Sequence, residues 1–134
     1  MAQAIVKYGP EGISIDELKD RARVEQLLRT LHAPFDTRAP LGSLIGILFD
    51  TVAEQHLIQP TFVYEHPVEL SPLAKTKKGD PSVVERFELY IGGMELANAY
   101  SELNDPVDQR ARFESQRVGQ ALVERNGVDP PRCL

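Results

Sequence analysis

One stretch in the second half of the chain determines how this protein folds: Glu85-Arg86-Phe87-Glu88-Leu89-Tyr90-Ile91-Gly92-Gly93-Met94-Glu95-Leu96-Ala97-Asn98-Ala99-Tyr100-Ser101-Glu102. Residues that favour β-strands lie on both sides of a Gly92-Gly93 dipeptide, and glycines readily adopt the positive φ angles of tight hairpin turns. We therefore predict a β-hairpin over residues 84–101 that turns at this dipeptide.

The hairpin carries two glutamates that could act together. Closure at Gly92-Gly93 places Tyr90 opposite Glu95 and Glu88 opposite Ala97, and residues two apart on a strand share a face. Glu88 and Glu95 are therefore predicted to be diagonal neighbours on one face. Two such carboxylates repel each other unless a cation lies between them, and Mg²⁺ binds one or two carboxylates together with substrate phosphates. The pattern is open to two interpretations, a metal–nucleotide site or a solvated sheet face, and the spacing alone favours the second.

Asn98 and Glu102 form a second polar pair, of a kind that could bind an amine. Strict alternation along the strand places them on the opposite face from Glu95. All four residues can line one pocket only if a β-bulge or a strong local twist lies between Glu95 and Asn98.

The rest of the chain predicts helices around a small antiparallel sheet, which is an α+β fold. Ser14 and Glu17 form a capping box for one of the helices, Pro40 suits the first turn of another, and Asp105 is a suitable N-cap for the last one. The expected elements, in order, are a helix within residues 1–8, a helix over 15–31, a helix from Leu41 that ends before Pro60, a strand at 61–64, a long loop over 67–81 with a possible strand at 68–70, the hairpin, and a helix to about Glu124 that is ended by Asn126-Gly127.

Composition narrows the classes of function. A chain of 134 residues fits one domain at most, and its net charge of −5 with scattered bases predicts poor nucleic-acid binding by the chain alone. No apolar run could span a bilayer or act as a secretory signal, and Cys133 is the single cysteine, so a cytoplasmic protein is expected. The three histidines show no ligand spacing, and no catalytic triad or phosphate-binding glycine-rich loop is visible. We therefore assign no catalytic residue.

Two long blocks resemble the class II lysyl-tRNA synthetases. They read Pro60-Thr61-Phe62-Val63-Tyr64-Glu65-His66-Pro67-Val68-Glu69-Leu70-Ser71-Pro72-Leu73-Ala74-Lys75, and then Glu85-Arg86-Phe87-Glu88 with Gly92-Gly93-Met94-Glu95-Leu96-Ala97-Asn98-Ala99-Tyr100-Ser101-Glu102-Leu103-Asn104-Asp105-Pro106. The similarity extends over residues 4–116 and implies part of a class II catalytic domain, an antiparallel sheet flanked by helices.

The resemblance also implies an activity, that of a lysine–tRNA ligase. Such an enzyme activates lysine with ATP and transfers the lysyl group to tRNA(Lys). The residues matching Glu88 and Glu95 would hold Mg²⁺ with the ATP phosphates. Those matching Asn98 and Glu102 would contact the substrate lysine, with Glu102 pairing with its ε-ammonium group.

Other features of this family are not matched within the 134 residues. Its first two signature motifs, which include an arginine that binds the ATP α-phosphate, would precede Met1. Its third motif, a glycine-rich strand–helix block with another ATP-binding arginine, would follow. We therefore expect a single incomplete catalytic-domain fragment over residues 1–134, family-like over 1–116 and divergent over 117–134. We predict that this fragment forms no lysyl-adenylate by itself, because the arginines that stabilise the transition state would be missing.

Two alternatives stay open at this point. One is a relative of the ligase that lysylates a translation elongation factor, although the sequence around Ser71 and Ser101 resembles the tRNA enzyme more closely. The other is a non-catalytic binding or regulatory paralogue. Association as a homodimer or with a full-length synthetase is compatible with any of these.

Overall fold

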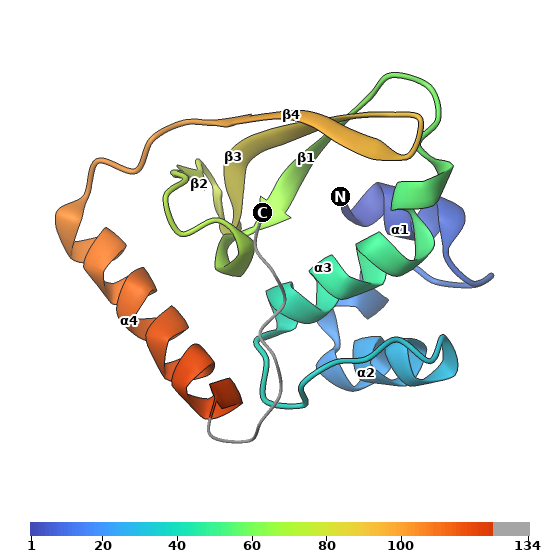
Figure 1. Cartoon of the computed structure of the whole chain (residues 1–134), viewed down its shortest axis with the longest axis horizontal. Helices are drawn as coiled ribbons and strands as arrows, with labels where there is room; N and C mark the ends of the chain where they lie inside the picture. The colour runs from blue at the N-terminus through green and yellow to red at the C-terminus, as the bar shows by residue number, and fades with distance from the viewer. Residues whose placement is uncertain (125–134) are drawn as a thin grey trace.

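A computed structural model describes the backbone of residues 1–124 and the side chains of residues 1–116. Within that part an antiparallel sheet of four strands is flanked by helices (Figure 1), as the α+β prediction requires. The elements are α1 (Ala2–Tyr8), the 3₁₀ turn η1 (Glu17–Lys19), α2 (Arg21–Thr30), α3 (Leu41–Val52), η2 (Glu54–His56), β1 (Thr61–Pro67), η3 (Val68–Leu70), β2 (Thr76–Lys77), β3 (Asp80–Ile91), β4 (Met94–Tyr100) and α4 (Pro106–Glu124).

The long strand β3 is the centre of the sheet. β1 pairs with one of its edges, and β2 and β4 pair with successive parts of the other edge. The hairpin between β3 and β4 turns at Gly92 and Gly93, whose φ angles of 65° and 73° confirm the predicted turn. Positive φ at two successive turn residues is the geometry for which glycine is suited.

Three helices cover one face of the sheet and enclose the core. α3 lies against this face, with α1 and α2 packed beside it (Figure 1). Phe49 of α3 meets Tyr90 of β3 edge-on, with ring centroids 5.8 Å apart. The largest fully buried apolar side chains are Ile5, Val24, Leu28, Leu44, Leu48, Phe49 and Val84.

The helix predicted over residues 15–31 is interrupted. The capping box forms as expected, since Ser14 N–H donates to Glu17 Oε2 at 2.8 Å and Glu17 N–H donates to Ser14 Oγ at 3.3 Å. This capping box begins only the short 3₁₀ turn η1, however, and not a long helix. Asp20 then becomes extended and accepts a hydrogen bond from Ala22 N–H at 2.9 Å, so it starts α2 as a new N-cap. The prediction of one long helix was wrong because Asp20 side-chain capping competes with continuation of the helix.

The loop predicted over residues 67–81 is more ordered than expected. Residues 68–70 form the 3₁₀ turn η3 in place of the suggested strand, while β2 and the start of β3 lie in the second half of the loop. The turn places Leu70 against α3 at Gly46, where an added Cβ would lie 3.0 Å from Leu70 Cδ1. This contact between distant parts of the chain gives no local sequence signal.

The last helix, α4, begins as predicted. Asp105 Oδ1 accepts hydrogen bonds from Val107 N–H at 2.9 Å and Asp108 N–H at 3.2 Å, which is N-capping. The predicted stop at Asn126-Gly127 lies outside the described residues. Among the helices that the structure describes, none has the length and apolar character needed to cross a membrane.

Candidate functional site

A β-bulge in strand β4 sets the geometry of the candidate site. Next to the turn, Tyr90 pairs with Glu95 as predicted, but Leu89 pairs with Ala97 and Glu88 pairs with Asn98. Leu96 is thus an extra residue with no partner on β3. The prediction that Glu88 faces Ala97 was wrong, because the bulge shifts the register by one residue.

The bulge lies in the interval where a shared pocket requires one. It brings Asn98 onto the same face as Glu95, directly opposite Glu88. Glu88, Glu95 and Asn98 therefore share the face that looks toward α3, which confirms the predicted common face of the two glutamates.

Glu102 lies farther along the chain, past the end of β4. It forms an isolated antiparallel bridge with Ala74, and Leu103 N–H donates to Leu73 O at 2.9 Å. Within residues whose side chains are described, no hydrogen bond or ion pair joins Glu102 to Glu88, Glu95 or Asn98. The backbone of Glu102 thus lies beside Leu73 and Ala74.

Glu88 is a buried carboxylate with two protein partners. Its side chain is 8% exposed, Arg86 Nη2 donates to Oε1, and Tyr90 O–H donates to Oε2 at 2.7 Å. A buried charge needs such partners to offset its desolvation. The sequence alone did not predict the hydrogen bonds from Arg86 and Tyr90 to Glu88, although residues 86, 88 and 90 alternate and so share one face of the strand.

His66 lies beside Glu88 in the interior. A bulge in β1 at Glu65, whose φ is 60°, turns His66 into the interior, where it is 1% exposed. Burial, together with the nearby positive charge of Arg86, lowers the pKa of His66 to about 4. The ring is thus neutral at pH 7, and its Nε2–H donates to Val63 O at 3.1 Å. Its 3.8 Å separation from Glu88 Oε2 is therefore a contact between a neutral ring and a carboxylate.

Two further carboxylates act on this face from the helical layer. Burial raises the pKa of Asp50 to about 6, with added repulsion from Glu54, Glu88 and Glu95. Burial also raises the pKa of Glu54, again with repulsion from Glu88 and Glu95. The four acidic groups therefore lie within electrostatic range of one another. A cation bound between them would relieve this repulsion.

These residues fit a Mg²⁺ ion that is shared with phosphates. In the described part of the chain, no cluster of three or more His, Cys, Asp or Glu side chains could hold a metal ion alone. Mg²⁺ bound with a nucleotide needs only one or two protein carboxylates, however, because phosphate oxygens and waters complete its shell. Glu95, which is exposed and makes no hydrogen bond to the described residues, has both oxygens available.

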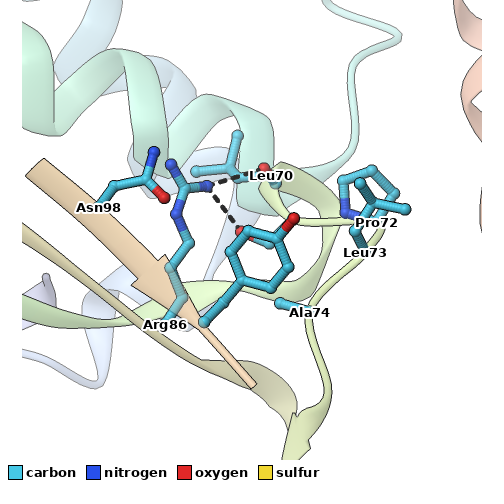
Figure 2. A pocket seen from close by; sticks show the side chains of 8 residues that line it. Leu70, Pro72, Leu73, Ala74, Arg86 and Asn98 are labelled. Atoms are coloured by element: carbon cyan, nitrogen blue, oxygen red, sulfur yellow. Dashed lines mark hydrogen bonds between the residues drawn. The ribbon is translucent and has the colours of Figure 1, made fainter. Parts of the chain in front are cut away.

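A pocket of about 180 Å³ opens next to these residues (Figure 2). Its polar side chains are those of Ser71, Arg86, Asn98 and Tyr100, and the other side chains of its walls are apolar. The lining residues are Leu70, Ser71, Pro72, Leu73, Ala74, Arg86, Asn98 and Tyr100.

Comparison with known proteins identifies the family. The family described as tRNA synthetases class II (D, K and N) matches residues 2–126. The chain belongs to the class II tRNA synthetases. Its similar relatives within them include the lysine–tRNA ligases of Pasteurella multocida and Histophilus somni, each 48% identical over 117 residues, which are 87% of this chain and 23% of each relative. The lysine–tRNA ligase of Listeria monocytogenes is 46% identical over 131 residues, 96% of this chain and 26% of the relative.

This chain spans about a quarter of the length of the curated class II relatives that it matches. The matched residues contain the whole hairpin, the bulge and the acidic face, by which we mean the carboxylates of Asp50, Glu54, Glu88 and Glu95. The candidate site thus lies within the residues that match the synthetase family.

Proposed function

We propose that this chain forms the acidic part of a lysine-activating site, in which Glu88 and Glu95 bind Mg²⁺ with ATP, and Asn98 and Glu102 bind lysine. The proposed reaction is that of a lysine–tRNA ligase, with lysyl-adenylate as the intermediate and tRNA(Lys) as the acceptor. A cytoplasmic location and association as a homodimer are parts of the same proposal. The observation that carries it is the bulge at Leu96, which gives Glu88, Glu95 and Asn98 a common face.

The electrostatics of this face support cationic ligands. Arg86 is the one cationic side chain paired with a carboxylate of the acidic face among the described residues, and His66 is neutral at pH 7. The four carboxylates Asp50, Glu54, Glu88 and Glu95 therefore outnumber their counter-charges. Mg²⁺ and the ammonium groups of lysine both supply the missing positive charge.

Each side chain has a defined chemical task in this proposal. When bound, Mg²⁺ neutralises negative charge that develops as pyrophosphate leaves. Asn98 can accept a hydrogen bond through its amide oxygen and donate through its amide nitrogen, so it can orient a polar ligand in the pocket. Glu102 is acceptor-only when ionised, which suits an ammonium donor.

Isothermal titration calorimetry on the 134-residue protein tests this proposal. We expect Glu102→Gln to weaken lysine binding about tenfold or more, because a hydrogen bond to a charged group contributes roughly 1.5–3 kcal/mol. Glu95→Gln should weaken binding of Mg²⁺-ATP while it leaves lysine affinity almost unchanged. The matched control is Glu85→Gln, since Glu85 is an exposed glutamate on the same strand pair but on the opposite face.

The ligand controls separate the alternatives. Norleucine has the shape of lysine without its ε-ammonium group, so it should bind much more weakly than lysine. Equal affinity for the two amino acids, or no binding of either one by a folded protein, would contradict the proposal and favour a non-catalytic docking protein. Size-exclusion chromatography of the same samples then reports association.

A further inference from the structure

Arg86 connects two parts of the site that are far apart in the sequence. Its Nη1 donates to Ser71 Oγ at 2.8 Å and to Leu70 O at 3.2 Å, both in the pocket wall (Figure 2). Its Nη2 pairs with Glu88 Oε1 on the same strand. One guanidinium thus bonds both the wall of the pocket and a proposed metal ligand.

The two anchors fix the guanidinium independently of Glu88. Ser71 is 5% exposed and Leu70 O belongs to the turn η3, so the Nη1 side of Arg86 is held by a different element of the fold. The planar fork of arginine can hold two acceptors at fixed angles, which a lysine ammonium group cannot do. Glu88 is therefore held by a group whose own position is set elsewhere.

Glu88 keeps room for a metal ion in this arrangement. An ionised carboxylate offers about four lone-pair sites on two oxygens. Arg86 takes one site on Oε1 and Tyr90 takes one site on Oε2. Each oxygen therefore retains a second site, and the two donors fix the direction in which those sites point.

Arg86 does not have the bonding pattern of a purely structural arginine. Its Nε is buried and has no hydrogen-bond partner among the described residues. An unsatisfied buried donor costs folding free energy. Local costs of this kind are typical of functional sites.

We propose that Arg86 is the positioning residue for Glu88, and that it holds this carboxylate in the orientation that binds Mg²⁺-ATP. This inference rests on the proposed function. Two effects of opposite sign act on metal affinity, because the charge of Arg86 repels Mg²⁺ whereas its hydrogen bond orients the ligand. The orienting effect prevails here, since partners that hydrogen-bond a metal ligand are typically worth about 10–100-fold in metal affinity.

Water-proton relaxation with Mn²⁺-ATP as the probe measures this effect on the full 134-residue chain. Arg86→Gln should weaken Mn²⁺-ATP binding about 10–100-fold. Ser71→Ala should weaken it less and in the same direction, because it removes one anchor of the guanidinium. Addition of guanidinium ion at millimolar concentration should partly restore binding to Arg86→Ala, whereas methylammonium should not.

Arg112→Gln is the matched control. Arg112 also donates to a carbonyl of the pocket wall, Ala74 O at 2.8 Å, and also pairs with a carboxylate, Asp108. Its side chain is 11% exposed against 18% for Arg86, but it contacts none of the proposed ligands. Its replacement should leave Mn²⁺-ATP affinity unchanged.

The outcomes separate the two proposals. If wild-type protein binds Mn²⁺-ATP and Glu95→Gln abolishes that binding, but Arg86→Gln binds as well as wild type or more tightly, then the positioning role is refuted and the proposed function stands. If folded wild-type protein does not bind Mn²⁺-ATP at all, the metal site itself is refuted. If the Arg112→Gln control loses as much affinity as Arg86→Gln, the effect is one of general stability and the positioning role fails.

Discussion

Replacement of His66 by Gln should change how the stability of the protein depends on pH. The pKa of His66 is lowered to about 4 in the folded state, from the ordinary value of 6.5 expected in the unfolded chain. The unfolded chain thus binds a proton more readily, so acidification favours unfolding. Stability from this group is fully present above pH 6.5 and is lost as the pH falls toward 4.

The size of the effect follows from these two pKa values. Between pH 7 and pH 5 the linkage relation gives a loss of about 2 kcal/mol from His66. No discount for solvent screening is needed because the side chain is 1% exposed. Glutamine does not titrate, and its amide can still donate to Val63 O.

Urea unfolding followed by far-ultraviolet circular dichroism is a suitable assay, because the chain contains no tryptophan. The free energy of unfolding of the wild type minus that of His66→Gln should fall by about 2 kcal/mol from pH 7 to pH 5. The subtraction removes the titration of all other groups. If the free energies of unfolding of the two proteins change equally with pH over this range, with equal m-values, then His66 is not held neutral by burial.

Three further changes test other parts of the fold. Asp50→Asn should raise the free energy of unfolding above pH 6 and have no effect near pH 3, because the raised pKa of about 6 reflects a penalty on the charged form in the folded state. The full pKa shift corresponds to roughly 3 kcal/mol, which the solvent exposure of this side chain reduces to about 1 kcal/mol. A pH-independent difference in denaturant midpoint would contradict this raised pKa. Tyr90→Phe should cost about 1–3 kcal/mol in urea unfolding, because it removes the donor to buried Glu88 but keeps the ring; an unchanged midpoint would argue against that hydrogen bond. Gly42→Ala should also destabilise the protein, because the new Cβ would lie 2.7 Å from Pro67 Cβ. This close contact should outweigh the helix preference of alanine over glycine, which is about 1 kcal/mol. A thermal melting temperature above that of the wild type would refute the close contact.

Local signals predicted the elements that depend on neighbouring residues. The Gly92-Gly93 turn, the start of α3 at Leu41 and the Asp105 cap all appear where the sequence indicates them. The common face of Glu88 and Glu95 followed from alternation alone. These features need only short-range geometry.

The features that the sequence did not predict depend on contacts between distant segments. Arg86 meets Ser71 across 15 residues, and neither residue signals the other. His66 is interior because Glu65 adopts a left-handed conformation that no propensity favours. A shared pocket requires a bulge or strong local twist between Glu95 and Asn98, but alternation alone does not show that the bulge forms or that Leu96 is the extra residue.

Leu96 has a consequence for how this strand tolerates change. Its side chain is 57% exposed, so many amino acids should be accepted at this position. Deletion of the residue would make the pairing regular while Ala97 stayed opposite Leu89 and Asn98 stayed opposite Glu88, so the side chains after it would keep their faces. Natural variation in this hairpin should therefore include loss of this residue as well as its replacement, because neither change moves Asn98 away from its place opposite Glu88.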